Sequence, residues 1–143
     1  MKKLLIPSIF FVLLISFSFA QKPYKVVFYN LENFFDTIND PEVLDDEFTP
    51  DGPKKWNTAK YNKKLNNTER VLFDIAAIDK NYPIVIGVSE VETRGVLEDI
   101  VATPKLAPAN YRIAHFDSPE ARGVDVAFLY RPDVFKIEGQ YPV

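Results

Sequence analysis

Short apolar runs separated by polar segments dominate the chain after residue 21. The residues from Tyr24 to Asn30 are β-branched and aromatic, which predicts a strand buried on both faces. A second apolar run, from Pro83 to Val88, has the length of a central strand and stops at Ser89-Glu90. Three further strands are predicted at residues 111–116, 124–130 and 134–137. Arg131-Pro132-Asp133 predicts a hairpin turn between the last two.

Two helices are predicted between these strands. The first begins at Thr58 as its cap and runs to about Asp79, with an apolar face formed by Tyr61, Leu65, Leu72, Ile75 and Ala76. Its other face carries Lys60, Lys63, Lys64 and Arg70. The second helix covers Arg94 to Ala102. Residues 36–57, rich in Asp, Glu and Pro, are predicted to form a long acidic loop.

The order of these elements predicts a mixed α/β architecture in a single domain. A strand, a loop, a helix, a second strand and a second helix are followed by antiparallel strands. An open sheet of this kind has an unprotected edge and half a core. We therefore expect residues 21–143 to form part of a larger sandwich.

The amino terminus has the pattern of a secretory signal peptide. Lys2 and Lys3 precede an apolar run from Leu4 to Phe19, and Ser18-Phe19-Ala20 fits cleavage after Ala20. An uncleaved membrane anchor is the alternative. Pro7 and a run of about 16 apolar-rich residues, against the ~20 needed to span a bilayer, favour cleavage. The mature protein is expected to be secreted or periplasmic, without stable membrane association.

Charge and composition narrow the possible chemistry. Without residues 1–20, whose only charges are Lys2 and Lys3, the chain carries 15 basic and 20 acidic side chains, a net charge of −5. This balance argues against nucleic-acid binding by bulk charge, but not against a nuclease that contacts phosphates through a few Arg side chains and a metal. The absence of Cys excludes thiol catalysis and thiolate metal sites. A metal must therefore use oxygen ligands or the single histidine, His115.

Polar residues follow the first two predicted strands. If these strands are neighbours in one sheet, Asn30 and Glu90 project from the same carboxyl edge, where sheet enzymes place their sites. A Glu and an Asn carbonyl suit Mg²⁺, which prefers oxygen ligands and keeps several waters. The alternative is that these groups only cap strand ends.

Three segments together resemble the endonuclease/exonuclease/phosphatase superfamily. They are Phe-Tyr-Asn-Leu-Glu-Asn-Phe-Phe-Asp at 28–36, Ile-Gly-Val-Ser-Glu-Val-Glu at 86–92, and Ala-Arg-Gly-Val-Asp-Val-Ala-Phe-Leu-Tyr-Arg-Pro at 121–132. This superfamily includes deoxyribonuclease I, exonuclease III type repair enzymes, inositol polyphosphate phosphatases and bacterial sphingomyelinases. The resemblance implies an α/β fold, the amino-terminal half of a four-layer deoxyribonuclease I-like α/β sandwich with a mixed sheet, whose carboxyl-terminal half lies outside residues 21–143.

The resemblance also implies roles for individual residues. Glu90 matches the Glu that binds Mg²⁺, and Asn30 matches the Asn beside the metal and the scissile phosphate. Glu32 falls where some members carry a second acidic ligand, with a solvated or cap-forming Glu as the alternative. Arg122 lies in a loop that often contacts phosphate, with a salt bridge to Asp117 or Glu120 as the alternative.

Two titratable residues remain open. Asp125 alternates with Val124 and Val126 in an apolar strand, so it is either a buried charge with a partner or an edge residue that faces water. His115 is expected to have a structural or rim role rather than a catalytic one. The superfamily's Ser-Asp-His and Gly-Asp-Phe-Asn type segments, which would prepare the attacking water, do not occur in this sequence.

The function that the resemblance implies is metal-dependent phosphoester hydrolysis. Nuclease-like cleavage of a phosphodiester, with nucleic acid among the candidate substrates, is favoured for the full-length protein, which is expected to be monomeric. Mg²⁺ is the expected cofactor, with Mn²⁺ or Ca²⁺ as substitutes. Residues 21–143 alone are expected to be inactive. The alternative is a truncated, catalytically inactive module that binds a phosphate ligand or a partner.

Overall fold

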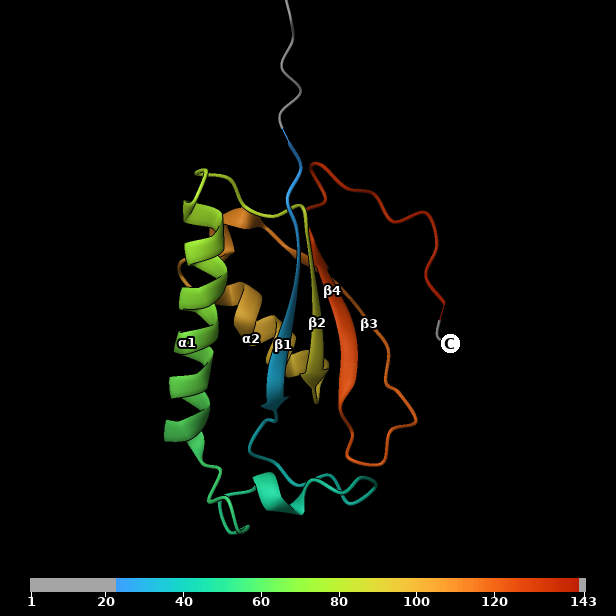
Figure 1. Cartoon of the computed structure of the whole chain (residues 1–143). Coiled ribbons are helices and arrows are strands. Elements are labelled where there is room, and N and C mark those ends of the chain that lie inside the picture. The colour runs from blue at the N-terminus through green and yellow to red at the C-terminus, as the bar shows by residue number, and fades with distance from the viewer. Residues whose placement is uncertain (1–22, 142–143) are drawn as a thin grey trace, which may run out of the picture.

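The computed structural model describes residues 23–141, which form one mixed sheet with two helices on one of its faces (Figure 1). The strands are β1 (Val26–Phe34), β2 (Val85–Val91), β3 (Arg112–His115) and β4 (Asp125–Tyr130), and the helices are α1 (Thr58–Ala77) and α2 (Arg94–Ala102). Two short 3-10 helices cover Asp46–Phe48 and Ala107–Ala109. The predicted α/β class with a mixed sheet is confirmed. The predicted signal peptide, residues 1–20, lies outside the described residues.

The sheet has the strand order β1-β2-β4-β3. β1 and β2 are parallel because the chain crosses back through α1 between them, whereas β4 runs antiparallel to both β2 and β3. The carboxyl ends of β1 and β2 therefore meet at one edge of the sheet. The β1–α1 loop and the β3–β4 loop lie beyond that edge, at the bottom of Figure 1.

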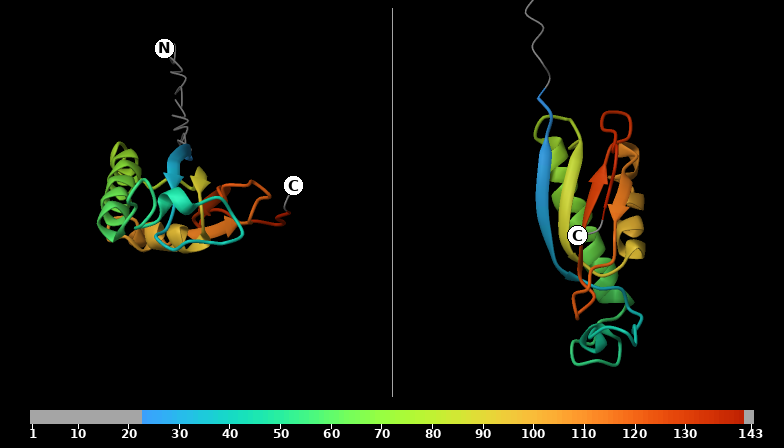
Figure 2. Two further views of the ribbon diagram at one scale, coloured as in Figure 1. Left: turned by 90° about the horizontal axis from the view of Figure 1, so that it is seen from below. Right: turned by 90° about the vertical axis from the view of Figure 1, so that its right-hand side faces the viewer.

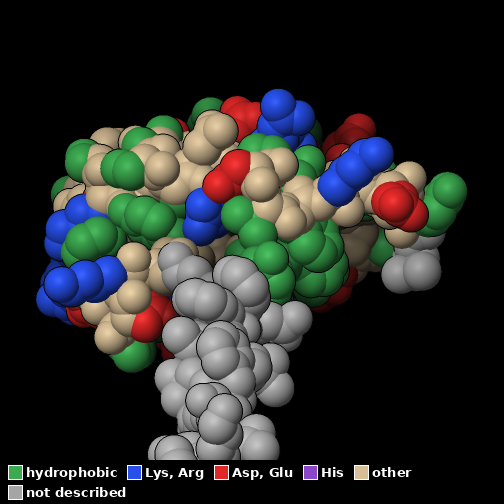
Figure 3. Space-filling view, turned by 90° about the horizontal axis from the view of Figure 1, so that it is seen from above, with side chains coloured by type: hydrophobic (Ala, Val, Ile, Leu, Met, Phe, Trp, Pro, Cys, Tyr) green, Lys and Arg blue, Asp and Glu red, His purple; other side chains and the backbone are tan. Residues whose placement is uncertain are grey.

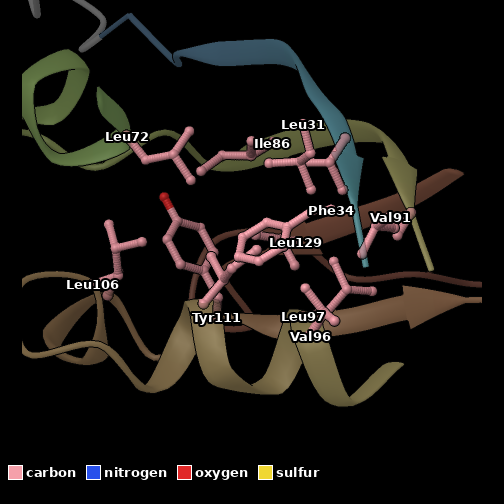
Figure 4. Packing of buried hydrophobic residues seen from close by; sticks show 14 residues of the cluster. Leu31, Phe34, Leu72, Ile86, Val91, Val96, Leu97, Leu106, Tyr111 and Leu129 are labelled. Carbon is pink, nitrogen blue, oxygen red and sulfur yellow. The ribbon is translucent and has the colours of Figure 1, made fainter. Parts of the chain in front are cut away.

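The hydrophobic core fills the space between the sheet and the helices (Figure 4). Leu31, Ile86 and Leu129 point from the sheet toward Leu72 of α1 and Leu97 of α2, and all five side chains are almost completely buried. Both helices lie on the same side of the sheet in the two views of Figure 2. No helix within residues 23–141 combines the length and the hydropathy needed to cross a membrane.

The opposite face of the sheet is apolar and open. Val26, Phe28, Val126 and Phe128 are 54–69% exposed. Gly87 lies between the two phenylalanines, since a Cβ built there would be 3.0 Å from the ring of Phe28 and 3.4 Å from that of Phe128. Viewed from above, hydrophobic side chains gather on the side of the molecule away from α1 (Figure 3). The prediction that the first strand is buried on both faces is therefore wrong.

Other boundaries also differ from the sequence predictions. β1 continues to Phe34 because, after a register shift that follows Asn30, Phe34 pairs again with Val91 of β2. Asn57 caps α1 by accepting a hydrogen bond from Lys60 N, so Thr58 is the first helical residue rather than the cap. The helix predicted at Arg94 to Ala102 is confirmed.

The strand predicted at residues 134–137 is not formed. The backbone N–H groups of Val134 and Phe135 both donate to Arg131 O, which closes a turn, and no returning strand pairs with β4. Asp133 accepts a bond from Arg131 Nη2 at 2.6 Å inside that turn. The turn prediction is therefore confirmed, but the hairpin prediction is wrong. The β-branched pattern at 134–137 carries no signal for a pairing partner, and β3 already occupies the free edge of β4.

We expect Leu97→Ala to lower the free energy of unfolding by about 3 kcal/mol, because it removes a fully buried side chain and leaves a cavity between α2 and the sheet. Urea denaturation followed by circular dichroism measures this change. Ile78→Ala, at a side chain that is 82% exposed, is the matched control and should change stability by less than about 0.5 kcal/mol. Equal effects of the two substitutions would contradict the assigned core.

Candidate metal and phosphate site

The structure brings Asn30 and Glu90 together at the carboxyl edge of the sheet. Asn30 of β1 lies opposite Ser89 of β2, so Glu90 is the next residue along. Asn30 Nδ2 donates to Glu90 Oε1 at 2.9 Å, and the backbone N–H of Asn33 donates to Glu90 Oε2 at 3.0 Å. Both carboxylate oxygens of Glu90 are therefore fixed by donors from β1.

The backbone at this edge is strained on both strands. Glu32, Asn33 and Glu90 have φ values of 56°, 58° and 59°, in the left-handed region that side-chain-bearing residues rarely adopt. Each such residue costs on the order of 1 kcal/mol and persists where surrounding contacts impose it. Here the register shift between β1 and β2 turns Asn33 N toward Glu90. Strain of this kind concentrates at functional sites, which singles out this edge.

The oxygen and the nitrogen of the Asn30 side-chain amide make separate contacts. Its Oδ1 accepts a hydrogen bond from Glu32 N at 2.7 Å, while its Nδ2 donates to Glu90. This network fixes the amide orientation, because the opposite assignment would face oxygen with oxygen and N–H with N–H. Asn30 therefore orients Glu90, and its carbonyl points to the backbone rather than to Glu90.

Glu90 has the acceptor capacity that a metal ligand needs. An ionised carboxylate offers about four lone-pair positions, and the bonds from Asn30 and Asn33 use two of them. Its oxygens thus remain able to ligate a hard cation. The Glu32 carboxylate is exposed and lies near enough to Glu90 for both to influence Lys64. These oxygens fit a divalent cation that is held directly by Glu90, with Glu32 as a second ligand.

Lys64 of α1 is a site residue that the sequence reasoning missed. Its Nζ donates to Glu32 O at 2.6 Å and to Asn33 O at 3.4 Å, so it supplies hydrogen bonds to the two backbone carbonyls of the strained turn. Burial lowers the pKa of the Lys64 ammonium, while the charges of Glu32 and Glu90 act in the opposite direction. The sequence placed Lys64 on the solvent face of the helix with other cations, and only the path of β1 distinguishes it from them.

Arg122 reaches the same edge from the β3–β4 loop. Its Nη1 donates to Asn33 Oδ1 at 3.2 Å, and its Nε donates to Glu120 Oε1 at 3.0 Å. The predicted salt bridge to Glu120 is formed, and Arg122 also lies beside Asn33, the residue that donates to Glu90. The phosphate contact stays a prediction. Half of the Arg122 side chain remains exposed, which leaves guanidinium donors available to an incoming anion.

The acidic loop forms a wall next to Arg122. Leu44 N donates to Ala121 O at 2.8 Å, which joins the two loops through their backbones. A cavity of about 330 Å³ opens between them, lined by Asn33, Phe35, Leu44, Asp46, Glu47, Phe48, Lys54 and Arg122. The predicted acidic loop thus lines the hollow beside the site.

A larger hollow of about 600 Å³ lies elsewhere, between the open face of the sheet and residues 135–141. Its lining includes Val126, Phe128 and Tyr130, but neither Asn33 nor Arg122. Its walls are mainly apolar. Its size therefore reflects the loosely covered apolar face. We place the chemistry next to the smaller cavity, because it is lined by Asn33, which donates to Glu90, and by Arg122.

Glu92, two residues after Glu90, is buried. Its Oε2 accepts a 2.6 Å hydrogen bond from Asp36 N, whereas the nearby Arg94 pairs with Glu98. Burial raises the pKa of Glu92 from 4.5 to about 8, and the carboxyls of Asp36 and Asp45 add to the shift, while the bond from Asp36 N opposes it. Glu92 is therefore largely protonated at neutral pH and ties the start of the acidic loop to the sheet.

His115 and Asp125 form a buried pair. His115 Nε2 lies 2.8 Å from Asp125 Oδ2, and their side chains are only 4% and 3% exposed. The interpretation of Asp125 as an edge residue facing water is therefore wrong, and the structural role for His115 fits this burial. Within residues 23–141, these two residues and Asp117 make up the one group of three potential ligands whose donor atoms all lie within 4.8 Å of one another.

We expect the buried Glu92 carboxyl to make stability fall as the pH rises. Because its pKa is higher in the folded state, its contribution is fully present below about pH 4.5 and is lost as the pH passes 8. Relative to Glu92→Gln, the wild-type free energy of unfolding should decrease by about 1.4 kcal/mol per pH unit between pH 5 and 8. Urea denaturation of both proteins across this range measures the difference, and parallel pH profiles would contradict the assignment.

Comparison with protein families gives one match, to a model described as the endonuclease/exonuclease/phosphatase family, over residues 25–142. No curated protein and no solved structure matches the chain. The match covers all four strands, including Glu90 in β2, and the β3–β4 loop that carries Arg122. It supports a hydrolase of the phosphoesterase or nuclease-like kind. Since family members generally use divalent metals, it also agrees with the oxygen donors found at this edge. The protein belongs to the endonuclease/exonuclease/phosphatase family.

Proposed function

We propose that this protein is part of a divalent-metal-dependent phosphoesterase that hydrolyses phosphodiester bonds. The observation that carries the proposal is the Glu90 carboxylate, held by Asn30 Nδ2 and Asn33 N, with Arg122 bonded to the same Asn33. A fixed carboxylate suits a hard cation, and a guanidinium beside it suits the phosphate that such a cation binds. The two groups share one residue, so metal and phosphate would meet at one place.

Each residue has a defined task in this proposal. Glu90 would hold Mg²⁺, with Glu32 as a second or water-mediated ligand and Mn²⁺ or Ca²⁺ as substitutes. When bound, the cation supplies positive charge that offsets the charge on the phosphoryl oxygens and the leaving group. Asn30 keeps Glu90 oriented. Arg122 donates to the phosphate from the other side of Asn33, and Lys64 keeps the strained turn closed.

The residues that would prepare the attacking water are proposed to belong to a second layer over the open face of the sheet. The exposed Val26, Phe28, Val126 and Phe128 form an apolar surface that a second sheet would bury, as in a four-layer sandwich. Asn30 lies on this same face because it alternates with Val26 and Phe28 along β1. A layer packed there would therefore approach Glu90 directly.

The acidic wall bears on the substrate. Asp46 and Glu47 line the cavity next to Arg122. Lys54 also lines it, but its ammonium pairs with Glu47 at 3.2 Å, so part of the positive charge of Lys54 is offset. A long polyanion entering from this side would meet carboxylates. We therefore propose a phosphodiester that presents a short or weakly charged group to this cavity, with nucleic acid retained as a candidate that would lie on the opposite side.

We further propose that the protein acts outside the cytoplasm, as a monomer, after removal of residues 1–20. The positively charged start, the apolar run and the small residues before Gln21 support export. The assignment rests on the sequence pattern alone.

We expect Glu90→Gln to weaken Mn²⁺ binding to the protein at least tenfold, because the substitution removes the charge while keeping the shape. Electron paramagnetic resonance of free Mn²⁺ during a titration measures this. In the full-length protein, Mg²⁺-dependent hydrolysis of bis-aryl phosphodiester, DNA and RNA should fall by about 100-fold or more, as expected for loss of a metal ligand. Glu98→Gln is the control, since it removes an exposed carboxylate that pairs with Arg94 on α2. Unchanged metal binding in Glu90→Gln would refute the site.

A chain restricted to residues 21–143 should bind Mn²⁺ but show no turnover of any of these substrates. The metal ligand Glu90 lies within these residues, whereas no residue found at the site is placed to prepare water: His115, the single histidine, is taken up by Asp125. Metal-dependent turnover by this chain would contradict the proposed second layer. Phosphate binding without turnover by the full-length protein would instead favour the binding-module alternative.

A further inference from the structure

The loop that carries Arg122 is fastened to the buried His115–Asp125 pair by a continuous series of hydrogen bonds. Asp125 Oδ2 pairs with His115 Nε2 at 2.8 Å, and Asp125 Oδ1 accepts from Ser118 N at 2.7 Å. Ser118 Oγ then donates to Val124 O at 3.1 Å and accepts from Glu120 N at 3.3 Å. Both ends of the loop are thereby joined across its base.

The series continues to the guanidinium. The Glu120 carboxylate accepts from the backbone N–H of Arg122 at 2.9 Å and from its Nε at 3.0 Å. This double contact fixes one edge of the guanidinium, and Nη1 on the other side reaches Asn33 Oδ1. The orientation of Arg122 at the site is thus set through Glu120 and Ser118 by Asp125.

Burial shows where the series is anchored. The Glu120 and Arg122 side chains are 40% and 52% exposed, so solvent competes with their contacts, whereas His115 and Asp125 are almost completely shielded. A shielded carboxylate must keep its partners, because an unpaired buried charge is costly. Asp125 lies opposite Val91, the residue after Glu90, so the anchor is built into the sheet next to the metal ligand.

A metal site at His115, Asp117 and Asp125 is the competing interpretation of this cluster. Both oxygens of Asp125 already accept hydrogen bonds, and Asp117 is exposed on the loop. The 2.8 Å separation of Asp125 Oδ2 from His115 Nε2 is also that of a direct hydrogen bond. These contacts favour a brace over a cation site.

We propose that His115 and Asp125 are positioning residues that, through Ser118 and Glu120, hold the guanidinium of Arg122 against Asn33, ready to receive a phosphate. The phosphate part rests on the proposed function, but the positioning of the loop does not. Neither His115 nor Asp125 touches the substrate in this arrangement. The role of both residues is exerted on a side chain several residues away in the same loop.

Hydrogen exchange of residues 116–124, measured by NMR on the purified protein without ligand, tests the positioning. Ser118→Ala removes a hydroxyl from a surface loop without opening the core, and His115→Leu removes the partner of Asp125. In both variants the amides of Glu120 and Arg122 should exchange at least about tenfold faster, because their acceptors lose their fixed positions. His115→Gln, which can still donate to Asp125, and Ser118→Thr should restore most of the protection, whereas Glu98→Gln should change nothing. Unchanged exchange in Ser118→Ala and His115→Leu would overturn the proposal.

Binding of inorganic phosphate in the presence of Mg²⁺, followed by calorimetry, tests the consequence at the site. Arg122→Ala should weaken phosphate about tenfold, Ser118→Ala should weaken it by several-fold, and the double variant should match Arg122→Ala alone, because Ser118 acts only through Arg122. An equal further loss on adding Ser118→Ala to Arg122→Ala would overturn the proposal.

Two further outcomes distinguish this inference from the proposed function and from a metal site at His115, Asp117 and Asp125. If the wild-type protein binds no phosphate, the proposed function fails, while the exchange measurements still decide the positioning. If the protein binds one Zn²⁺ tightly and both His115→Leu and Asp117→Asn abolish that binding, the cluster is a metal site and the positioning role is refuted.

Discussion

The parallel pairing of β1 with β2 sets where every polar group of the site lies. It brings Asn30 opposite Ser89. At the register shift that follows, three groups of β1 form one network with Glu90: the Asn30 side-chain amide, the Glu32 N–H and the Asn33 N–H. The left-handed backbone at Glu32, Asn33 and Glu90 is the cost of this arrangement. Lys64 and Arg122 then attach to atoms that the network has already placed.

The sequence alone predicts the framework because its elements are encoded by local patterns. Short apolar runs are sufficient to find β2 and β4, and helical spacing is sufficient to find α2. The polar residues at the strand ends then predict that Asn30 and Glu90 lie at one edge of the sheet. The same patterns fail where the structure depends on distant contacts. A β-branched run at 134–137 looks like a strand, but no strand edge is free beside β4 to receive it.

The site residues divide in the same way. Glu90 is found because it lies at the end of a strand, and Arg122 because it lies in a motif. Lys64 is missed because its position along α1 groups it with Lys60, Lys63 and Arg70, which face solvent. The burial of Glu92 is not evident from sequence for a related reason: the acidic loop folds back and brings Asp36 and Asp45 beside it. A charge is assigned from sequence according to its neighbours in the chain, and these two have their decisive neighbours elsewhere.

The acidic loop between β1 and α1 contacts the β3–β4 loop that carries Arg122, although the two loops lie far apart in the sequence. Gly123 has φ 70°, and a Cβ there would lie 3.0 Å from Val43, so the loops approach as closely as their backbones permit, with Leu44 N bonded to Ala121 O. Neither loop can be lengthened, shortened or given a side chain at Gly123 without moving the other. A substitution that changes the shape of the cavity from one loop therefore requires a matching substitution in the other loop. Mutation would reshape this cavity through double rather than single replacements.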